Sequence, residues 1–370
     1  MPHLVAIDLP GGQSFVDALS RIWDAGDAAF PIDRRLPRAA RQRTLAAIAP
    51  DRLIDDDGGG MHDLDGFGVE AGDALVVATS GTSGEPRGVV LTHAAVAASA
   101  QATSRRISVV GDDTWLACLP LSHVGGLSVV TRALVTGAAL VVHDGFDAGR
   151  VEAEARRGAT LVSLVATALQ RIDPTLFRCI VLGGAHPPED RPHNVVTTYG
   201  MTETGSGVVY DGIPLDGVDV RVDGDDEIHL RCPMLLRCYR DGSSPLIDGW
   251  LTTGDLGEID PAGRLVVHGR REELIITGGE NVWPAPVEAA IRTHPGVLDV
   301  TVTGVPDPDW GQRVVAWIVA TDLTAEPTLA SIRAVCTASL PAFMAPKEVC
   351  IVAALPTTTS GKVVRRDLPA

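Results

Sequence analysis

The chain has 370 residues, of which 45% are hydrophobic and only 4% aromatic, and its formal net charge is −16. This length exceeds what one hydrophobic core ordinarily supports, so we expect at least two folding units. The many Ala, Val and Gly residues favour close-packed α/β layers, and the negative charge argues against a nucleic-acid-binding surface, which needs a basic face.

The six cysteines show no CxxC spacing, so the sequence predicts free thiols rather than a metal site or a disulfide framework. The start of the chain, MPHLVAIDLPGG, has neither a basic segment nor a long apolar run, and no apolar stretch is long enough to span a bilayer. We therefore expect a cytoplasmic protein without a transmembrane segment and without a nucleic-acid partner.

Hydrophobic periodicity over roughly the first 200 residues predicts buried strands that alternate with helices. The predicted helices cover residues 14–25, 34–50, about 92–106, 126–137 and 151–159. The predicted strands cover residues 73–80, 114–121, 139–143, 160–165, 178–185 and 194–200. This alternation implies parallel βαβ units, whose ligands bind beyond the carboxyl ends of the strands.

From about Gly212 the pattern changes to short strands separated by Asp-Gly turns, which indicates an antiparallel or barrel-like subdomain. A boundary is expected near residues 269–273. Beyond it, helices at 287–296 and 329–340 and strands at 299–305, 313–320 and 348–355 form an α+β unit of roughly one hundred residues, an ordinary domain size.

The stretch TSGTSGEPRG, residues 79–88, combines four hydroxyl side chains and three glycines. We predict that it lies between a strand and a helix. Glycine allows backbone N–H groups to approach an anion closely, and hydroxyls with one cation can complete a polyphosphate site. The stretch lacks the GK[ST] ending of the Walker pattern, and taken alone it could equally be an ordinary loop.

This stretch resembles the phosphate loop of the acyl-adenylate-forming superfamily, which includes acyl-CoA synthetases. Further segments resemble that family in the same order: LPLSHVGG (119–126), TTYGMTETG (197–205), GWLTTGD (249–255), GRREELIITGGENVWPAPVE (269–288) and LPTTTSGK (355–362). The resemblance implies an α/β fold with a large N-terminal domain over 1–269, a hinge at 270–272 and a small mobile C-terminal domain over 273–370. It also implies an ATP-dependent acid–thiol ligase that works through an acyl-adenylate.

The resemblance implies which residues bind ATP and Mg²⁺. The β- and γ-phosphates would be held by Thr79, Ser80, Gly81, Thr82, Ser83, Gly84 and Arg87, the last at a position where the family usually has lysine. Adenine and ribose would contact Gly183, Gly184, Ala185, Tyr199, Gly200, Asp255 and Arg270. The small residues in this set could equally serve strand-end packing. Glu203 would hold Mg²⁺ and Thr202 would reach the α-phosphate.

Only two of the 31 basic residues are lysine, namely Lys347 and Lys362. The resemblance makes Lys362 the catalytic amine, because a compact ammonium can insert between the acid and the α-phosphate where a planar guanidinium cannot. Lys347 is expected at the surface. The hinge role falls on Glu272, where the family more often has Asp or Lys, and the loop expected to face the CoA tunnel contains Gly278, Gly279 and Glu280.

The segment 122–137 is more similar to the o-succinylbenzoate–CoA ligases of menaquinone biosynthesis than to fatty acyl-CoA synthetases. It predicts a reaction of 2-succinylbenzoate, ATP and CoA, with an acid pocket lined by His123, Gly125, Gly126 and Ser206. His123 could instead be a gate without substrate contact. Arg132 is a weaker candidate for binding the second carboxylate of that acid, because a helix position can equally place it in solvent.

Three alternatives remain open at the sequence level. The same fold could activate a medium-chain or aryl acid, or it could transfer the acyl group to a carrier protein. A non-catalytic nucleotide-binding module is disfavoured by the presence of Lys362 and Glu203. A homodimer is an open possibility.

Overall fold

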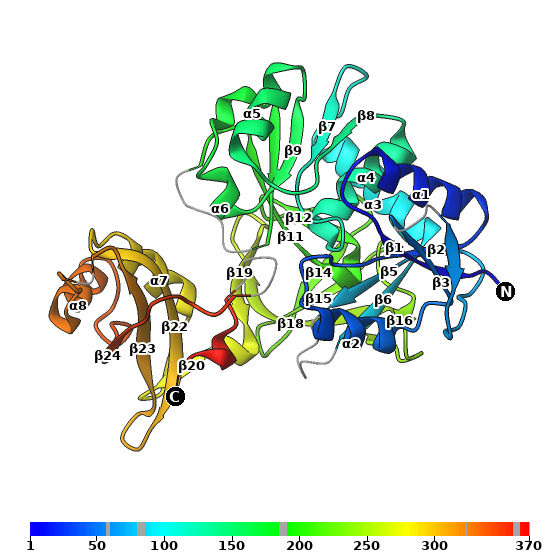
Figure 1. Ribbon diagram of the computed structural model, residues 1–370. Helices are drawn as coiled ribbons and strands as arrows, with labels where there is room; N and C mark the ends of the chain where they lie inside the picture. The colour runs from blue at the N-terminus through cyan, green and yellow to red at the C-terminus, as the bar shows by residue number, and fades with distance from the viewer. Residues whose placement is uncertain (57–59, 80–85, 185–190, 323, 358–362, 370) are drawn as a thin grey trace. The chain divides into compact units, whose positions relative to one another are not determined.

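The computed structural model describes residues 1–56, 60–79, 86–184, 191–322, 324–357 and 363–369 (Figure 1). The chain divides into two compact units. The first comprises Met1–Arg221, His229–Thr252 and Ile259–Leu265, and the second comprises Val222–Ile228, Thr253–Glu258 and Val266–Ala370. Helices and strands are mixed in both units, which confirms the predicted α/β class.

The first unit contains a seven-stranded sheet with the order β16-β6-β5-β2-β1-β3-β4. Its strands are β1 (Leu4–Asp8), β2 (Ala28–Pro31), β3 (Arg52–Asp55), β4 (Met61–Asp63), β5 (Asp73–Thr79), β6 (Arg87–Thr92) and β16 (Cys238–Tyr239). The central strands β1, β2, β3 and β5 run parallel, whereas β4, β6 and β16 are antiparallel to their neighbours.

A second sheet of seven strands has the order β13-β12-β11-β10-β9-β7-β8. Its strands are β7 (Thr114–Ala117), β8 (Ala139–Val142), β9 (Leu161–Leu164), β10 (Cys179–Leu182), β11 (Val195–Met201), β12 (Ser206–Tyr210) and β13 (Ile213–Pro214). The strands from β8 to β11 are parallel, as the alternation of helices and strands predicted. Strands β12 and β13 add an antiparallel edge.

Two helices, α3 (His93–Arg106) and α4 (Val124–Thr136), lie between these two sheets (Figure 1). Helix α4 packs on β7 and β9, while α3 packs on β5 and β6. Every residue from Gly126 to Ala133 is buried, so this part of α4 has no solvent face. The other helical segments of the unit are α1 (Gln13–Asp24), α2 (Arg38–Ile48), α5 (Ala148–Arg156), α6 (Ala166–Leu169), η1 (Pro174–Leu176) and η2 (Thr202–Thr204).

The expected strand–loop–helix arrangement around residues 79–88 is wrong in one respect. The helix does begin after Thr92, whose side chain accepts a hydrogen bond from the Ala95 N–H as an N-cap. Between the loop and this helix, however, strand β6 returns antiparallel to β5. The run RGVVLT is short and apolar enough to complete a hairpin, so the loop joins two strands.

A third sheet follows Gly212, where short strands were predicted. It has the order β14-β15-β18-β17, with β19 paired to β18. Its strands are β14 (Asp219–Val222), β15 (Glu227–Arg231), β17 (Leu246–Ile247), β18 (Trp250–Ile259) and β19 (Leu265–Arg270).

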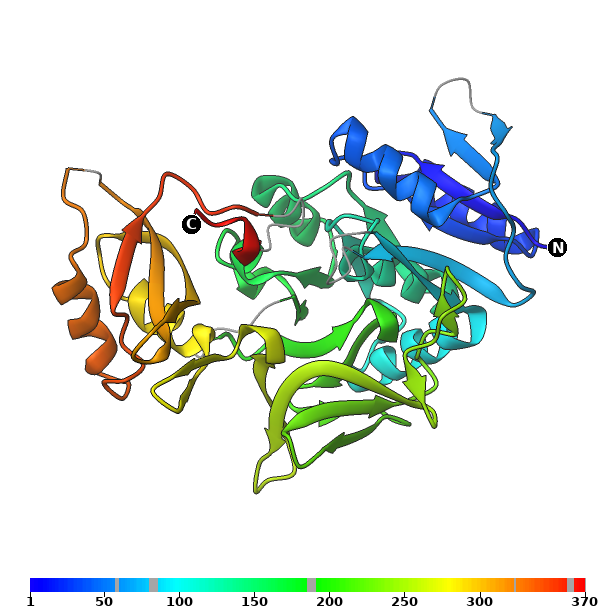
Figure 2. The ribbon, with the colours of Figure 1, turned by 90° about the horizontal axis from the view of Figure 1, so that it is seen from below.

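The second unit contains a sheet in which β22 (Val297–Asp307) and β23 (Gly311–Ala320) form a long antiparallel pair. The remaining elements are η3 (Arg271–Glu273), β20 (Ile275–Thr277), β21 (Glu280–Val282), α7 (Pro284–Arg292), α8 (Leu329–Thr337), β24 (Glu348–Ile351) and η4 (Arg365–Asp367). Alternate strand residues such as Val314, Ala316 and Ile318 form a core with α7 and α8, which the orange and yellow ribbons show beside the sheet (Figure 2). The opposite face, with Val315 and Trp317, packs against Leu355.

All six cysteines are free, as predicted. No helix in the described part of the chain combines the length and the apolar composition that a bilayer crossing requires.

Candidate active site

The hairpin of β5 and β6 brings the two ends of the predicted phosphate loop together. Thr79 and Arg87 are cross-strand partners at the last register position of the hairpin. The intervening residues Ser80, Gly81, Thr82, Ser83 and Gly84 lie outside the described residues. The hairpin therefore holds the predicted phosphate cation, Arg87, directly opposite the first hydroxyl of the loop.

The Arg87 side chain contacts β16 and the short turn that follows it. Its guanidinium carbon lies 4.1 Å from the ring centroid of Tyr239. One of its nitrogens donates to the Ser243 hydroxyl at 3.3 Å and lies 3.6 Å from a carboxylate oxygen of Asp241. Hydrogen bonds from Ser243, together with Arg87, keep the pKa of the Asp241 carboxyl below its usual value. The Arg87 side chain remains 43% exposed, so an incoming phosphate can reach it.

Glu203 lies in the turn η2, which an internal hydrogen-bond network fixes. The Thr204 side chain is fully buried. Its hydroxyl accepts from the Met201 N–H at 2.9 Å and lies 2.6 Å from the Ser206 carbonyl oxygen, to which it donates. Sequence reasoning did not single out Thr204, although its position directly after Glu203 could have indicated a role in shaping the turn.

Tyr239 is a second residue that the sequence analysis missed. Its hydroxyl donates to Oε1 of Glu203 at 3.0 Å. Burial, followed in importance by the nearby Glu203 charge, raises the pKa of Tyr239 to about 12, so the phenol stays a neutral donor at physiological pH. The sequence around it, LLRCYRD, carries no pattern that marks a binding site.

The geometry of Glu203 suits a magnesium ion that is bound mainly through substrate. Oε1 is held by Tyr239, whereas Oε2 has no hydrogen-bond partner among the described residues. No group of three His, Cys, Asp or Glu side chains in the described ranges could hold a metal by itself. Mg²⁺ is commonly held by one or two carboxylates together with phosphate oxygens and water, so Glu203 fits that role.

The predicted adenine residues lie at or just beyond the ends of two neighbouring parallel strands. Gly183 and Gly184 come directly after β10, and Tyr199 and Gly200 lie near the end of β11. Gly184 has a φ of +91°, and a Cβ on Gly200 would lie 2.3 Å from the Ser206 carbonyl oxygen, so both positions require glycine. Ala185 lies outside the described residues, and Thr202 is half-buried in η2.

The two predicted ribose residues contact each other. Asp255 on β18 is buried, with 6% of its surface exposed, and its Oδ1 lies 2.9 Å from Nε of Arg270. A second Arg270 nitrogen donates to the carbonyl oxygen of Thr253 at 2.9 Å. The pair therefore presents one carboxylate and one guanidinium in fixed positions.

His123 stands at the N-terminus of α4, where its Nε2 lies 3.3 Å from Oδ2 of Asp33. Burial alone would raise the pKa of Asp33, but its contacts with His123 and Arg35 outweigh this and lower it. Gly125 is exposed, whereas a Cβ on Gly126 would lie 2.4 Å from the Leu119 carbonyl oxygen. Gly126 therefore has a packing reason to be glycine.

Arg132 is buried. The alternative that its position on a helix places it in solvent is therefore wrong. The residue is 2% exposed, because α4 lies between two sheets. One guanidinium nitrogen donates to the hydroxyls of Ser206 at 2.6 Å and Ser128 at 3.1 Å. Its Nε and its other terminal nitrogen have no partner among the described residues. The guanidinium carbon lies 5.3 Å from the Trp115 ring, and burial lowers the pKa of Arg132.

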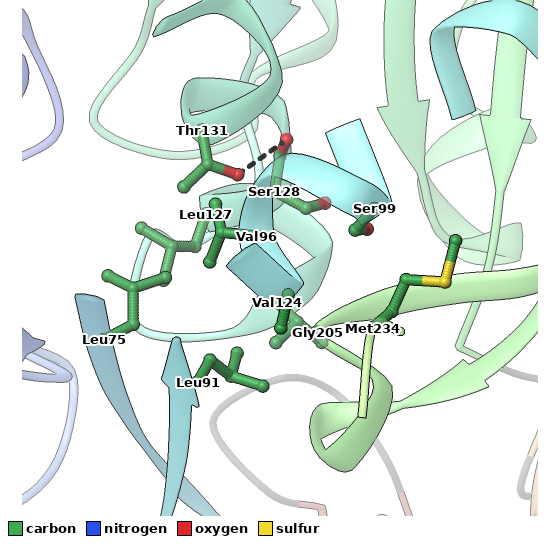
Figure 3. Close-up of a pocket in the computed structure, with 11 residues that line it drawn as sticks. Leu75, Leu91, Val96, Ser99, Val124, Leu127, Ser128, Thr131, Gly205 and Met234 are labelled. Carbon is green, nitrogen blue, oxygen red and sulfur yellow. Dashed lines mark hydrogen bonds between the residues drawn. The ribbon is translucent and has the colours of Figure 1, made fainter. Parts of the chain in front are cut away.

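A small void of about 10 Å³ lies beside this cluster, between α3, α4 and the turn at Gly205 (Figure 3). Its wall is mainly apolar, and the hydroxyl groups of Ser99, Ser128 and Thr131 also line it. Thr131 donates to the Ser128 carbonyl oxygen at 3.3 Å, which is the dashed line in Figure 3. A void of this size holds at most about one water molecule, so it is too small to be an acyl pocket.

In the second unit, Glu272 is exposed in the turn η3, and Gly278 and Gly279 form the tight turn between β20 and β21 with φ values of +61° and +84°. Two positive φ values favour a Gly-Gly hairpin turn. A Cβ on Gly278 would lie 2.7 Å from the Trp310 ring. Glu280 is exposed, and Lys362 lies outside the described residues.

Lys347 does not lie free at the surface. Its ammonium nitrogen is 3.1 Å from the ring centroid of Trp310 and is shielded from solvent, so the surface expectation is wrong. Trp310 itself is 49% exposed. An aromatic ring and a cation therefore adjoin the Gly278–Gly279 turn.

Two family models match this chain. The AMP-binding enzyme family matches residues 69–229, and the AMP-binding enzyme C-terminal domain matches residues 286–362. A relative from Mycobacterium tuberculosis, named probable 2-succinylbenzoate–CoA ligase, is 37% identical and covers 98% of this chain and 97% of its own length. The 2-succinylbenzoate–CoA ligase of Bacillus cereus is 35% identical over 79% of this chain and 69% of its own length.

Solved structures of one enzyme are similar to this chain along nearly its whole length. The o-succinylbenzoate CoA synthetase (MenE) of Bacillus subtilis, in complex with the acyl-adenylate OSB-AMP, has a TM-score of 0.89 at 27% identity and covers 99% of this chain and 87% of its own. The same enzyme with ATP and a magnesium ion has a TM-score of 0.87 at 28% identity, covering 99% and 89%. With these matches along nearly its whole length, the chain belongs to the AMP-binding enzyme family of adenylate-forming ligases.

Proposed function

We propose that this protein joins 2-succinylbenzoate to CoA at the expense of ATP, a step of menaquinone biosynthesis. A carboxylate oxygen of the acid attacks the α-phosphorus of ATP and pyrophosphate leaves. The CoA sulfur then attacks the carbonyl carbon of the acyl-adenylate, and AMP leaves. Both steps require crowded negative charge to be neutralised and the reacting groups to be aligned.

Arg132 carries the choice of acid. A buried cation without an anionic partner is costly, by several kcal/mol even after the protein relaxes, and no carboxylate among the described residues lies within ion-pair distance of it. A substrate with a second carboxylate would pair this charge, whereas a fatty acid would leave it unpaired. The hydroxyls of Ser128 and Ser206 hold one guanidinium nitrogen and leave two others for the ligand. The names of the relatives favour the same acid.

ATP would be held by the residues that the sequence assigned to it. Arg87 and residues 79–84 would hold the β- and γ-phosphates, and Asp255 with Arg270 would hold the ribose hydroxyls. Thr202 would contact the α-phosphate, and Gly183, Gly184, Ala185, Tyr199 and Gly200 would border adenine. Glu203 would hold Mg²⁺, which neutralises phosphate charge when bound.

The domain organisation forms part of the proposal. Residues 1–269 would bind ATP and the acid, residues 270–272 with Glu272 would act as the hinge, and residues 273–370 would move between the two half-reactions. Lys362 would act in adenylation, and the turn at Gly278, Gly279 and Glu280 would face CoA during transfer. The neighbouring Trp310 ring and Lys347 ammonium offer stacking and positive charge to a phosphorylated nucleotide.

The test is ATP–pyrophosphate exchange with a panel of carboxylic acids, followed by thioester detection with CoA. We expect exchange with 2-succinylbenzoate, and weak or no exchange with octanoate or benzoate. Exchange with a fatty or aryl acid but not with 2-succinylbenzoate would exclude the proposed acid. If no acid supports exchange, the proposed activity as an acid–CoA ligase is wrong.

The alternation of the small domain has its own test. Lys362→Ala should reduce adenylation by about 100-fold or more, the scale of removing one group that stabilises charge in a transition state. Transfer of the acyl group from preformed adenylate to CoA should stay within about threefold of wild type. Equal losses in both half-reactions would contradict the alternation. Lys347→Ala serves as the matched lysine control and should leave adenylation intact.

A further inference from the structure

Tyr239 links two of the side chains assigned to ATP, although no sequence motif marks it. It lies on β16, which pairs antiparallel with β6 so that Tyr239 opposes Val89, two residues beyond Arg87. Its hydroxyl donates to Oε1 of Glu203 at 3.0 Å, and its ring lies under the Arg87 guanidinium at 4.1 Å. One side chain therefore contacts both the predicted metal carboxylate and the predicted phosphate cation.

The contact with Glu203 has a directional consequence. A carboxylate on a flexible side chain can rotate, and fixing one oxygen removes much of that freedom. Because the phenol donates a single hydrogen bond to Oε1, it orients Oε2 without occupying it. The phenol is a neutral donor, so it brings no positive charge that would balance the carboxylate in place of a cation.

The contact with Arg87 restrains a second charge. The Arg87 guanidinium lies against the Tyr239 ring and also contacts Ser243 and Asp241. These three partners belong to one turn, which is closed by a hydrogen bond from the Tyr239 N–H to the Ser243 carbonyl oxygen at 2.8 Å. The turn thus holds the cation in place before a phosphate arrives, which lowers the ordering cost of binding.

We propose that Tyr239 is a positioning residue for magnesium-bound ATP, which aims the free oxygen of Glu203 at the metal ion and the Arg87 guanidinium at the phosphates. The proposal rests on the nucleotide site described under the proposed function. It requires no proton transfer and no covalent step. It predicts that loss of the hydroxyl weakens the response to Mg²⁺, whereas loss of the ring also weakens the response to ATP.

The experiment compares the full-length wild type with Tyr239→Phe and Tyr239→Leu. Calorimetry measures ATP binding at several Mg²⁺ concentrations without any acid, and pyrophosphate exchange measures the same dependence during turnover. For Tyr239→Phe we expect the Mg²⁺ concentration for half-saturation to rise about tenfold, the scale of one hydrogen bond to a charged group, with near-normal exchange at saturating Mg²⁺. Tyr239→Leu should in addition raise KM for ATP by about threefold to tenfold.

Tyr210→Phe is the matched control, because the Tyr210 hydroxyl pairs with Thr103 at 3.1 Å in the core. It should leave the Mg²⁺ dependence unchanged even if it lowers thermal stability. An unchanged Mg²⁺ half-saturation in Tyr239→Phe, or a change matched by Tyr210→Phe, overturns the proposal. If the wild type binds magnesium-bound ATP but no acid supports exchange, the proposed function fails and the binding data alone decide on Tyr239.

Discussion

Two arginines of the predicted site, Arg270 and Arg132, have opposite surroundings. Arg270 meets the carboxylate of Asp255 at 2.9 Å, so its charge is balanced within the protein. Arg132 has two hydroxyl partners and no carboxylate among the described residues. The carboxylate of Asp255, held by Arg270, can accept hydrogen bonds from hydroxyl groups. Arg132 has no carboxylate beside it among the described residues, so it attracts an anion from a ligand. The difference separates the proposed ribose site from the proposed site for the second acid group of the substrate.

The largest expected effect comes from removing the unpaired charge. Arg132→Met should lower kcat/KM for 2-succinylbenzoate by about 100-fold or more, because a buried charge pair with one partner removed loses about 3–5 kcal/mol. Two analogues each lack one of the two carboxylates, 4-oxo-4-phenylbutanoate and 2-butanoylbenzoate. The one that keeps the reacting carboxylate should then be used nearly as well as the diacid. Competition between the acids in pyrophosphate exchange measures this ratio.

The stability of Arg132→Met tests whether Arg132 also supports the fold. Since an apolar residue of similar length replaces an unpaired buried charge, the free energy of unfolding in urea should stay equal or rise by about 1–2 kcal/mol. Arg105→Met, which removes an exposed arginine paired with Asp216, should change neither the preference for the diacid nor the free energy of unfolding. A loss of stability together with retained preference for the diacid would show that Arg132 serves the fold.

The paired arginine should respond in the opposite way. Asp255→Asn should raise KM for ATP by about 30-fold, the scale of losing charged hydrogen bonds to the ribose, and should leave the preference among acids unchanged. It should also lower the free energy of unfolding by about 1–2 kcal/mol, because Arg270 is 36% exposed and solvent compensates it partly. Steady-state kinetics and urea unfolding measure the two effects.

The control for that variant is Asp219→Asn, which breaks an exposed pair with Arg231 and should have little effect on either measurement. If Asp255→Asn changes stability but not KM for ATP, Asp255 holds Arg270 in place and does not contact the ribose.

The sequence predicted the elements well where the pattern was long and local. The buried strand at β5 and the alternation from β7 to β11 appear as expected, and the family resemblance is confirmed. The strand β6 was missed because its six residues follow a glycine-rich loop that masks their periodicity. The burial of Arg132 could have been foreseen, since GLSVVTRALVTG is apolar on all sides and such helices lie inside the protein.

Tyr239 could not have been found in this way. Its role depends on β16 lying beside β6, a pairing between residues about 150 positions apart, and the hydrogen bond to Glu203 follows only from that pairing. Local sequence patterns carry no information about such a long-range contact. The residues proposed to bind ATP stand in recognisable motifs, whereas Tyr239, which is proposed to orient two of them, is brought to the site by the fold.

The smallest expected effect on activity concerns Arg178, an arginine outside the proposed binding sites. Arg178 donates two hydrogen bonds to Asp113, a carboxylate that is 2% exposed and that also accepts from Thr160. Burial alone would raise the pKa of Asp113, but the hydrogen bonds from Arg178 and Thr160 outweigh it and the pKa is lowered. Neither residue lies in a motif assigned to ATP, CoA or the acid.

Asp113→Asn should therefore leave exchange activity unchanged at pH 7 and lower the free energy of unfolding by about 2 kcal/mol. Because the folded pKa lies below the unfolded value of about 3.9, the stabilisation is fully present above that value and is lost as the pH falls toward the folded pKa. The difference between wild type and variant in urea unfolding should thus shrink between about pH 5 and pH 3. A difference that stays constant over this range would mean that packing, and not the ionised carboxylate, accounts for the stability.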